Sequence, residues 1–277
     1  MILAISSQVV RGTVGLNVAV PCLQVTGCEA WLLPTTLLSC HPGLASPQGK
    51  GLAVDDLTRI MAVLLVENWL QDIDGILTGY FAGPAQVAAV ADLIGHIKSL
   101  NPGVIYACDP VLGDHPKGLY VKESVAEAIR DKLVPMADIT TPNMFELGWL
   151  TGWDAEGQAA VAPIAHKLKP AEVLVTSIPG RKNTLHVHAA LKSGKGLWAQ
   201  TRVRPSAPQG LGDGLAALYL GFRLKGLSPT EALSRTIAAI EDLLDHSQGQ
   251  HDLVLGRLGQ RLQKLDPWPI ETGGFGT

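Results

Sequence analysis

Short apolar runs alternate with longer amphipathic segments over most of the chain. The short runs are typical of buried β-strands and lie at 2–6, 31–33, 75–78, 104–109, 138–140 and 173–176. The longer segments repeat their apolar residues at helical spacing and lie at 54–70, 84–100, 215–224 and 230–244. This strand–helix rhythm predicts an α/β fold in which a mainly parallel sheet is covered by helices on both faces.

Two segments late in the chain depart from this rhythm. Residues 184–191 and 196–204 alternate polar and apolar positions around a Lys-Ser-Gly-Lys turn, which predicts an antiparallel hairpin at the edge of the sheet. No repeat or long linker divides the sequence, so we expect a single domain over residues 1–277. The Pro- and Gly-rich tail at 266–276 cannot continue a helix, and we expect it to form a surface extension.

Composition excludes several classes of protein. The 277 residues carry 22 Lys and Arg against 25 Asp and Glu, a formal net charge of −3, so we expect no nucleic-acid partner. The longest apolar stretches fall short of the ~18 residues that a spanning helix needs, and we expect no membrane partner. The N-terminal run lacks a basic region before it, which argues against a secretory signal. Four cysteines without a Cys-x-x-Cys pair favour the reducing cytoplasm over a disulfide framework.

The strongest chemical signal is Gly210-Leu211-Gly212-Asp213-Gly214, which follows a Pro-rich loop and precedes the predicted helix at 215–224. Glycines let a ligand approach the backbone closely, and the free N–H groups at a helix N-terminus favour a phosphate. Asp213 is placed to take a proton from an attacking hydroxyl group while those amides stabilise the transferred charge. The competing interpretation is that Asp213 only caps the helix.

Oxygen-bearing side chains also follow two predicted strands. Asp109 and Asp114 lie in the run Cys-Asp-Pro-Val-Leu-Gly-Asp at 108–114, and Glu146 ends the run Thr-Pro-Asn-Met-Phe-Glu at 141–146. Carboxylates are typical ligands of Mg²⁺, usually with waters and substrate phosphates, so the three acids together predict a nucleotide–metal site. Taken separately, Asp109 is also explained as a helix-capping acid and Asn143 as an Asx-turn residue.

With these runs in view, the sequence resembles the ribokinase-like superfamily and, within it, the pyridoxal kinases. The resemblance extends from Ile2 to about Ala232. It rests on SQVVRG at 7–12, GY at 79–80, CDPVLGD at 108–114, GLYV at 118–121, TPNMFE at 141–146, VTS at 175–177 and GLGD at 210–213. The resemblance implies a ribokinase-like three-layer fold and a homodimer in which apolar helices of the N-terminal half pack together.

The same resemblance implies an ATP-dependent kinase that phosphorylates the 5′-hydroxymethyl group of pyridoxal, with pyridoxine and pyridoxamine as further substrates, in vitamin B6 salvage. Asp213 is then the base, and Gly210 and Gly212 supply amides to the moving phosphoryl group. Mg²⁺ is the implied cofactor, held with ATP by Asp109, Glu146 and Asp114. The implied ATP-binding residues are Asp109, Thr141, Asn143, Glu146, Thr176, Ser177, Gly210, Leu211 and Gly212. The implied substrate-binding residues are Ser7, His41, Tyr80 and Asp213.

The chain departs from the family pattern at several positions. Gln8 replaces a His, Asn17 stands one place later than the usual Asn, and Leu211 replaces a Thr of the glycine motif. The loop at 39–44 lacks a hydroxyl and an aromatic side chain expected near the substrate ring. His41 is itself also explained as an ordinary turn residue. The cation that contacts the phosphates is left open between Arg204, Lys182 and neither.

The altered substrate loop keeps two further functions open. One is hydroxymethylpyrimidine kinase, whose flat aromatic alcohol is chemically similar to pyridoxal. The other is a non-catalytic vitamin B6- or nucleotide-binding relative, against which the joint presence of Asp213, Asp109 and Glu146 argues. A Rossmann-type dinucleotide enzyme is excluded, because the glycine-rich turn comes late in the chain and no G-x-G-x-x-G follows the first strand.

Overall fold

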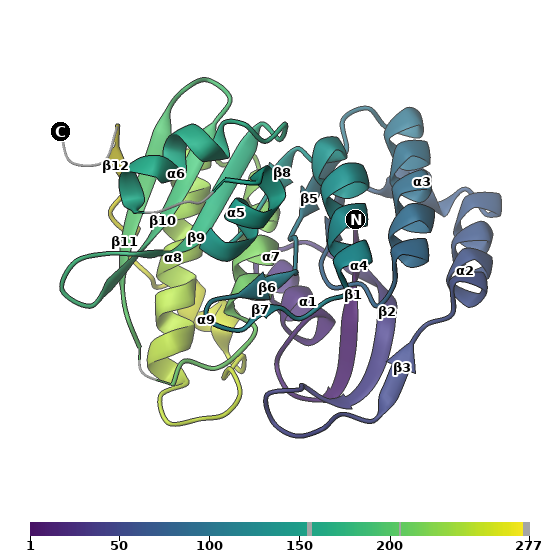
Figure 1. The fold of residues 1–277 in the computed structure, drawn as a ribbon, viewed down its shortest axis with the longest axis horizontal. Helices are drawn as coiled ribbons and strands as arrows, with labels where there is room; N and C mark the ends of the chain where they lie inside the picture. Colours follow the sequence, from purple (N-terminus) through teal and green to yellow (C-terminus); the bar gives the residue numbers. More distant parts are fainter. Residues whose placement is uncertain (154–156, 205, 274–277) are drawn as a thin grey trace.

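A continuous mixed sheet crosses the protein in the computed structural model, which describes residues 1–153, 157–204 and 206–273 (Figure 1). Within these residues the sheet has ten strands in the order β12-β11-β10-β9-β8-β5-β4-β1-β2-β3. Its strands are β1 (Ile2–Arg11), β2 (Ala30–Cys40), β3 (Gly49–Gly51), β4 (Gly75–Thr78), β5 (Ile105–Cys108), β8 (Ile139–Thr140), β9 (Glu172–Pro179), β10 (Thr184–Leu191), β11 (Gly196–Arg202) and β12 (Glu271–Thr272). The strands from β2 to β9 are parallel, whereas β3 and the β10–β12 group are antiparallel to their neighbours.

Helices cover both faces of this sheet, as the strand–helix rhythm predicts (Figure 1). The helices are α1 (Leu16–Val25), α2 (Val54–Val66), α3 (Pro84–Leu100), α4 (Glu123–Ala128), α5 (Met144–Thr151), α6 (Gln158–Ala165), α7 (Leu211–Leu224), α8 (Pro229–His246) and α9 (Leu258–Leu262). Single turns of 3₁₀ or π helix follow at Trp69–Asp72, Ile129–Leu133 and Val134–Met136. A separate two-stranded flap, β6 (Gly113–Asp114) with β7 (Gly118–Leu119), lies over the middle of the molecule.

Alternate side chains of the central strands enter different cores. On β1, Ile2 and Ala4 join the core formed with α1, α7 and α8, whereas Leu3 and Ile5 join the core formed with α2, α3 and α4. This two-residue alternation buries both faces of the strand, which explains why the run is apolar at nearly every position. A third, smaller core lies between β9–β11 and helices α5 and α6.

Two predicted element boundaries are wrong, and helix α1 was not predicted. The first strand does not end at residue 6: β1 runs to Arg11, with a register shift against β2 between Ser6 and Ser7. Helix α7 begins at Leu211 rather than at 215, because Gly210 adopts a left-handed conformation (φ 93°) and serves as its N-cap. Because β1 and α7 both pack against α1, this helix has no continuous polar face. Its sequence therefore lacks the amphipathic pattern that is typical of a surface helix.

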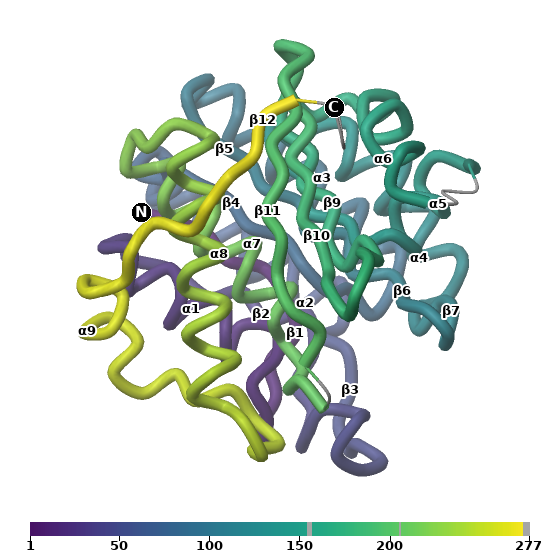
Figure 2. The backbone as a smooth tube through the Cα atoms, turned by 90° about the vertical axis from the view of Figure 1, so that its left-hand side faces the viewer, coloured from purple at the N-terminus to yellow at the C-terminus, as the bar shows by residue number. Residues whose placement is uncertain are grey.

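The C-terminal tail is not merely a surface extension. Figure 2 shows it running back along β11, where β12 pairs with Leu197 and Trp198. The Trp268 indole N–H donates to the carbonyl of Gln200, and the Ser234 hydroxyl donates to the carbonyl of Trp268. The tail therefore covers the hairpin edge of the sheet, and residues 274–276 of the predicted extension lie outside the described residues. Among the described helices, none is both long enough and apolar enough to cross a membrane.

Candidate active site at the carboxyl ends of the strands

The glycine motif packs the N-terminus of α7 directly against the β1–α1 turn. Gly210 has φ 93°, and a Cβ on it would lie 1.9 Å from the carbonyl oxygen of Thr13, so only glycine fits at this position. Gly212 is different, because a Cβ there would meet nothing within 4 Å among the described residues. The first-turn N–H groups of a helix have no intrahelical acceptor and carry its positive dipole end. The open space beside Gly212 is thus a cradle suited to a phosphate.

Asp213 is the third residue of α7, and its carboxylate is used for something other than capping. Among the described residues, no side chain caps α7. The Asp213 carboxylate instead accepts a hydrogen bond from the N–H of Gly15, and its Oδ1 lies beside Gly79. Burial raises the pKa of Asp213 from its ordinary value to about 6, although the Gly15 hydrogen bond opposes the shift. This pKa is close to the value that suits a general base at neutral pH.

Two of the three further predicted substrate residues lie near Asp213 at the ends of β1 and β4. Ser7 is buried at the β1 register shift, and its Oγ lies against Gly15, where an added Cβ would come within 2.4 Å. Tyr80 follows β4; its N–H donates to the Ser6 hydroxyl, and its carbonyl accepts from the Thr35 hydroxyl. These contacts bring Ser7, Tyr80 and Asp213 to one end of the sheet.

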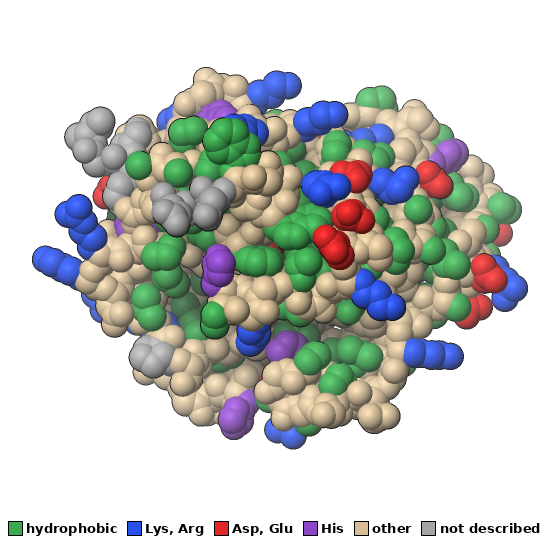
Figure 3. Space-filling model, in the orientation of Figure 1, with side chains coloured by type: hydrophobic (Ala, Val, Ile, Leu, Met, Phe, Trp, Pro, Cys, Tyr) green, Lys and Arg blue, Asp and Glu red, His purple; other side chains and the backbone are tan. Residues whose placement is uncertain are grey.

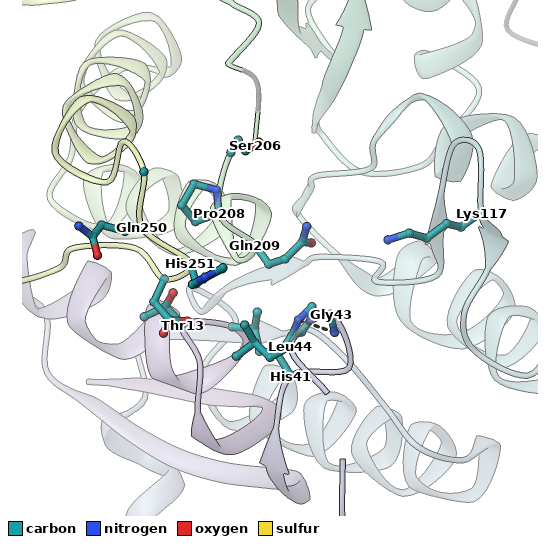
Figure 4. A pocket seen from close by; sticks show the side chains of 14 residues that line it. Thr13, His41, Gly43, Leu44, Lys117, Ser206, Pro208, Gln209, Gln250 and His251 are labelled. Carbon is teal, nitrogen blue, oxygen red and sulfur yellow. Dashed lines mark hydrogen bonds between the residues drawn. The ribbon is translucent and has the colours of Figure 1, made fainter. Parts of the chain in front are cut away.

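His41 lies further out, at the wall of a cavity of about 550 Å³. Its Nδ1 accepts the N–H of Gly43, which is the turn role that the sequence had left open. Figure 4 shows Lys117, from the β6–β7 flap, reaching toward the cavity from the side opposite His41 and Leu44. Other lining residues come from 206–209, before the glycine motif, and from 249–252, after α8. The space-filling view in Figure 3 shows the molecule hollowed between its two halves.

The acids after β5 and β8 are held by two different networks. Asp109 is buried, and its Oδ1 accepts a hydrogen bond of 2.6 Å from the Thr141 hydroxyl. Burial and the nearby charge of Asp213 raise the pKa of Asp109 to about 7. Asp109 does not cap a helix, so that interpretation is wrong. Asn143 has a structural role, but as a helix cap and not as the Asx-turn residue considered for it: its Oδ1 accepts the N–H of Glu146 at the N-terminus of α5.

Glu146 is the most heavily hydrogen-bonded carboxylate of the site. Its Oε2 accepts the N–H of Asn143, which completes a capping box, and its Oε1 accepts the N–H groups of Leu112 and Gly113. Burial and the charge of Asp109 raise the pKa of Glu146 to about 8, while these backbone donors pull it down. Glu146 therefore fixes the start of the flap relative to α5.

The three predicted metal ligands do not form a ready-made cluster. Among the described residues, no group of three or more His, Cys, Asp or Glu side chains is arranged to hold a metal ion. Asp114 nevertheless has a buried Oδ1 that finds no hydrogen-bond partner in the part of the chain that the structure describes. Asp109 and Asp114 thus keep lone pairs for an external cation, whereas those of Glu146 are already engaged with backbone N–H groups.

Tyr120 joins these acids without having been assigned a role from the sequence. Burial and the negative charges of Glu146, Asp109, Asp114 and Asp213 raise its pKa above the ordinary value, which places the phenol among the acids. The signal was available in the GLYV run at 118–121, where an aromatic residue follows the flap. The phenol is a hydrogen-bond donor at the point where negative phosphates are expected.

Thr176 and Ser177 end the parallel part of β9 beside Asn143. Thr176 forms a bridge with Asn143, and Ser177 adopts a left-handed conformation (φ 56°), which is uncommon for a residue other than glycine. The two candidate cations lie differently. Arg204 pairs with Glu241 and Asp245 of α8, at 2.8 and 2.6 Å. Lys182 is exposed in the β9–β10 turn. Arg204 is therefore already neutralised, whereas Lys182 and Lys117 form no ion pair within the described residues.

Comparisons with known proteins agree with this geometry. The profile of the phosphomethylpyrimidine kinase family matches residues 60–254. A pyridoxal kinase PdxY of Granulibacter bethesdensis is 32% identical over 96% of both chains, and the pyridoxal kinase of Sus scrofa is 34% identical over 88% of this chain and 81% of its own. The crystal structure of pyridoxal kinase from Entamoeba histolytica superposes with a TM-score of 0.91 at 27% identity, covering 98% of this chain and 99% of the other.

A solved complex adds the ligand classes of a relative. Pyridoxal kinase from Leishmania donovani, bound to ADP and pyridoxamine, has a TM-score of 0.91 at 26% identity and covers 98% of this chain and 99% of its own. The match in sequence and fold extends over nearly the whole chain, well beyond the glycine motif. This chain is therefore a kinase with the ribokinase-like fold and belongs to the pyridoxal kinase family.

Proposed function

We propose that this protein transfers the γ-phosphoryl group of ATP to the 5′-hydroxymethyl group of pyridoxal. The observation that carries the proposal is the position of Asp213 on the first turn of α7, with its carboxylate beside Gly15 and Gly79 and its pKa raised to about 6. The base and the phosphate cradle then lie on the same helical turn. A hydroxyl group activated by Asp213 is therefore already close to the phosphoryl group.

The reaction asks the protein for alignment, charge neutralisation and a base. The hydroxyl oxygen forms a bond to the γ-phosphorus, its proton passes to Asp213, and the bond from the γ-phosphorus to the β–γ bridging oxygen breaks as ADP leaves. The first-turn amides at Leu211 and Gly212 stabilise charge on the transferred group. We propose that the nucleotide contacts Thr141, Asn143, Thr176 and Ser177. The products of the reaction are ADP and pyridoxal 5′-phosphate.

Mg²⁺ is the proposed cofactor, and it would be held with ATP by Asp109 and Asp114. Both have carboxylate oxygens without a hydrogen bond from the described residues, and the unpartnered Oδ1 of Asp114 is buried. When bound, a Mg²⁺ ion would neutralise the negative charge of the phosphates. Glu146 is proposed to act differently from a direct ligand, since its hydrogen bonds to Leu112 and Gly113 hold the flap that carries Asp114.

The substrate side is proposed to comprise Ser7, Tyr80 and His41. A buried hydroxyl such as Ser7 can bond a ring nitrogen or phenol of pyridoxal, and Tyr80 can stack on a flat heterocycle. His41 and Lys117 line the outer cavity, next to the 39–44 loop that lacks the expected hydroxyl and aromatic side chains. The vitamers pyridoxine and pyridoxamine share the reacting hydroxymethyl group and are further proposed substrates.

A hydroxymethylpyrimidine kinase activity is the second candidate. It is favoured by one specific observation, the match of residues 60–254 to the phosphomethylpyrimidine kinase profile. The same acceptor chemistry would serve it, because a hydroxymethylpyrimidine presents the same kind of alcohol on a flat ring. The substrate-binding residues therefore decide between the two candidates.

A homodimer is proposed at the β2–α2 end of the sheet. On α2, Ile60, Val63 and Val66 recur every third residue and are exposed, with Val66 at 76%. Leu32 and Leu37 of β2 are also exposed at this end of the sheet. Apolar side chains that gather on one helix face of a monomer are typical of an interface with a second protein chain. A second copy of this chain would cover them.

We also propose that the whole chain acts as one domain in the cytoplasm. A single sheet joins residues from Ile2 to Thr272, which supports one domain. The structure describes all four cysteines, and each is unpaired, as a reducing compartment favours.

Turnover of four alcohols, measured side by side, tests the proposed function. Purified protein with Mg²⁺ and ATP is given pyridoxal, pyridoxine, pyridoxamine or hydroxymethylpyrimidine, and the phosphorylated product is quantified by mass. We expect pyridoxal to be phosphorylated with the highest kcat/KM. Turnover of the pyrimidine alone would establish the second candidate, and turnover of none of the four would contradict kinase activity on this class of alcohol.

A further inference from the structure

Two departures from the family pattern, Gln8 and Asn17, are joined by a side-chain hydrogen bond in the structure. The Gln8 side-chain amide on β1 donates to the Asn17 side-chain oxygen on α1. The Asn17 amide nitrogen then donates to the carbonyls of Val9 and Gly12, both at 2.9 Å. Both N–H groups of the Asn17 side chain and one lone pair of its oxygen are therefore engaged in hydrogen bonds within this turn. We call Gln8 and Asn17 the amide clamp.

The amide clamp closes the turn that joins β1 to α1. Gly12 and Gly15 both have positive φ, 117° and 56°, so the chain reverses sharply between Arg11 and Leu16. The Asn17 amide ties the two sides of this turn together, because it donates both to the carbonyl of Val9, near the end of β1, and to the carbonyl of Gly12, inside the turn. Without it, the two carbonyls would need another donor and the turn would lose its register.

The turn carries four contacts of the proposed active site. The N–H of Gly15 donates to the carboxylate of Asp213, and Gly15 also lies against Ser7. The carbonyl of Thr13 lies under Gly210, so close that no Cβ fits between them. At the far end, the Arg11 carbonyl accepts the N–H of His41 at 3.3 Å. One turn thus adjoins the proposed base, the phosphate cradle and the substrate loop.

We infer that the amide clamp formed by Gln8 and Asn17 is a positioning element for the phosphoryl transfer, which holds the 12–15 turn so that the Gly15 N–H aims at Asp213. The two substitutions compensate one another: an amide at position 8 reaches an Asn that stands one residue later on α1. Neither residue touches the reacting atoms. Their effect passes through the backbone, where a displacement of roughly 1 Å can cost about 100-fold in rate.

The inference rests on the proposed function, and its effects are predicted to be selective. The nucleotide residues Asn143, Thr176 and Ser177 lie on the other side of the sheet centre, after β8 and β9, and among the described residues they form no hydrogen bond with the turn. Loss of the amide clamp should therefore lower kcat and leave the KM for ATP nearly unchanged. A purely structural role would instead lower the melting temperature and the active fraction without changing kcat per folded molecule.

The test uses Asn17→Asp, which keeps the size of the side chain and removes the two donations to backbone carbonyls. Gln8→Ala removes only the orienting bond, and Gln8→His supplies a ring N–H in its place. Gln24→Ala, on the exposed face of the same helix, is the matched control. We expect N17D to lower kcat on pyridoxal by 10- to 100-fold with the KM for ATP within about 2-fold. Q8A should lower kcat less, Q8H should restore most of it, and Q24A should match the wild type.

A double-mutant cycle and an activity-independent measurement complete the test. Since both residues act through one clamp, the double variant Q8A/N17D should be no slower than N17D alone. Hydrogen exchange in a peptide spanning residues 10–18 should be faster in N17D than in the wild type and in Q24A, with no substrate present. Unchanged exchange, additive losses of kcat, or parallel changes in kcat and the KM for ATP would overturn the inference. Faster exchange in a protein whose wild type turns over no alcohol would contradict only the proposed function.

Discussion

Two glycines of the GLGD motif lie in opposite surroundings, and alanine substitutions should separate their roles. A methyl group on Gly210 would meet the Thr13 carbonyl at 1.9 Å at a backbone φ of 93°. The left-handed conformation costs roughly 1–2 kcal/mol for an L-residue, and the forced separation of packed groups adds about 1–3 kcal/mol. We expect G210A to lose roughly 2–5 kcal/mol of unfolding free energy. A methyl group on Gly212 would point into open space, and alanine favours a helix by up to ~1 kcal/mol over glycine.

Thermal unfolding and steady-state kinetics measure the two effects on the same samples. For a chain of this size, the G210A loss corresponds to a drop in melting temperature of roughly 5–15 °C, with kcat about 100-fold lower. G212A should melt at or above the wild-type temperature and still lose kcat/KM for ATP, because its methyl group occupies the phosphate cradle. Wild-type stability in G210A would refute the packing of α7 on Thr13, and full activity in G212A would refute the cradle.

Three further predictions follow from the carboxylates and the apolar helix face. Since Asp213 must lose its proton to act as a base, kcat/KM for pyridoxal should rise with pH through about 6, and an acid limb near pH 4 in the rate profile would contradict its raised pKa. Asp109 has a folded-state pKa of about 7, above its unfolded value, so its ionisation costs stability as pH rises from about 4 to 7. Asp109→Asn keeps an acceptor for Thr141 and should raise the melting temperature of the free protein at pH 8 by several degrees, not at pH 4, while abolishing turnover. Val63→Glu should convert the proposed dimer into a monomer in light scattering, whereas Val254→Glu, at another exposed valine, should not; a V63E dimer would move the interface elsewhere.

The parallel centre of the fold was predictable from the sequence because its strands are buried on both faces. Runs such as 75–78 and 104–109 are apolar at most positions, and the structure confirms strands there as β4 and β5. The predicted strand end at residue 6 was wrong, because the polar residues Ser6, Ser7 and Gln8 are typical of a loop. In the structure β1 continues to Arg11, and β2 pairs with it along this segment. Strand β12 has only two residues, so its sequence shows no periodicity. Hydrogen bonds from the indole N–H groups of Trp268 and Trp198 hold the tail in place.

The candidate site was predictable where backbone chemistry forces a residue type. Gly210 belongs to this class, because its positive φ and its contact with Thr13 exclude side chains. The different roles of the acids were not predictable, since they depend on backbone N–H groups that bond to Glu146 but not to the Oδ1 of Asp114. The bond between Gln8 and Asn17 depends on the path of a turn, and no spacing rule relates those two positions.

The central claim is that Asp213 is the base of a B6-vitamer kinase, and the Asp213→Asn variant tests it most directly. The measurement is kcat for pyridoxal 5′-phosphate formation by wild type and variant at saturating Mg²⁺ and ATP, with ATP affinity determined on the same samples by calorimetry. Asparagine preserves the shape and the acceptor for the Gly15 N–H but accepts no proton from the substrate. The account predicts a loss in kcat of roughly 10²–10⁴-fold with ATP binding nearly intact. A variant that keeps most of the wild-type kcat would contradict it.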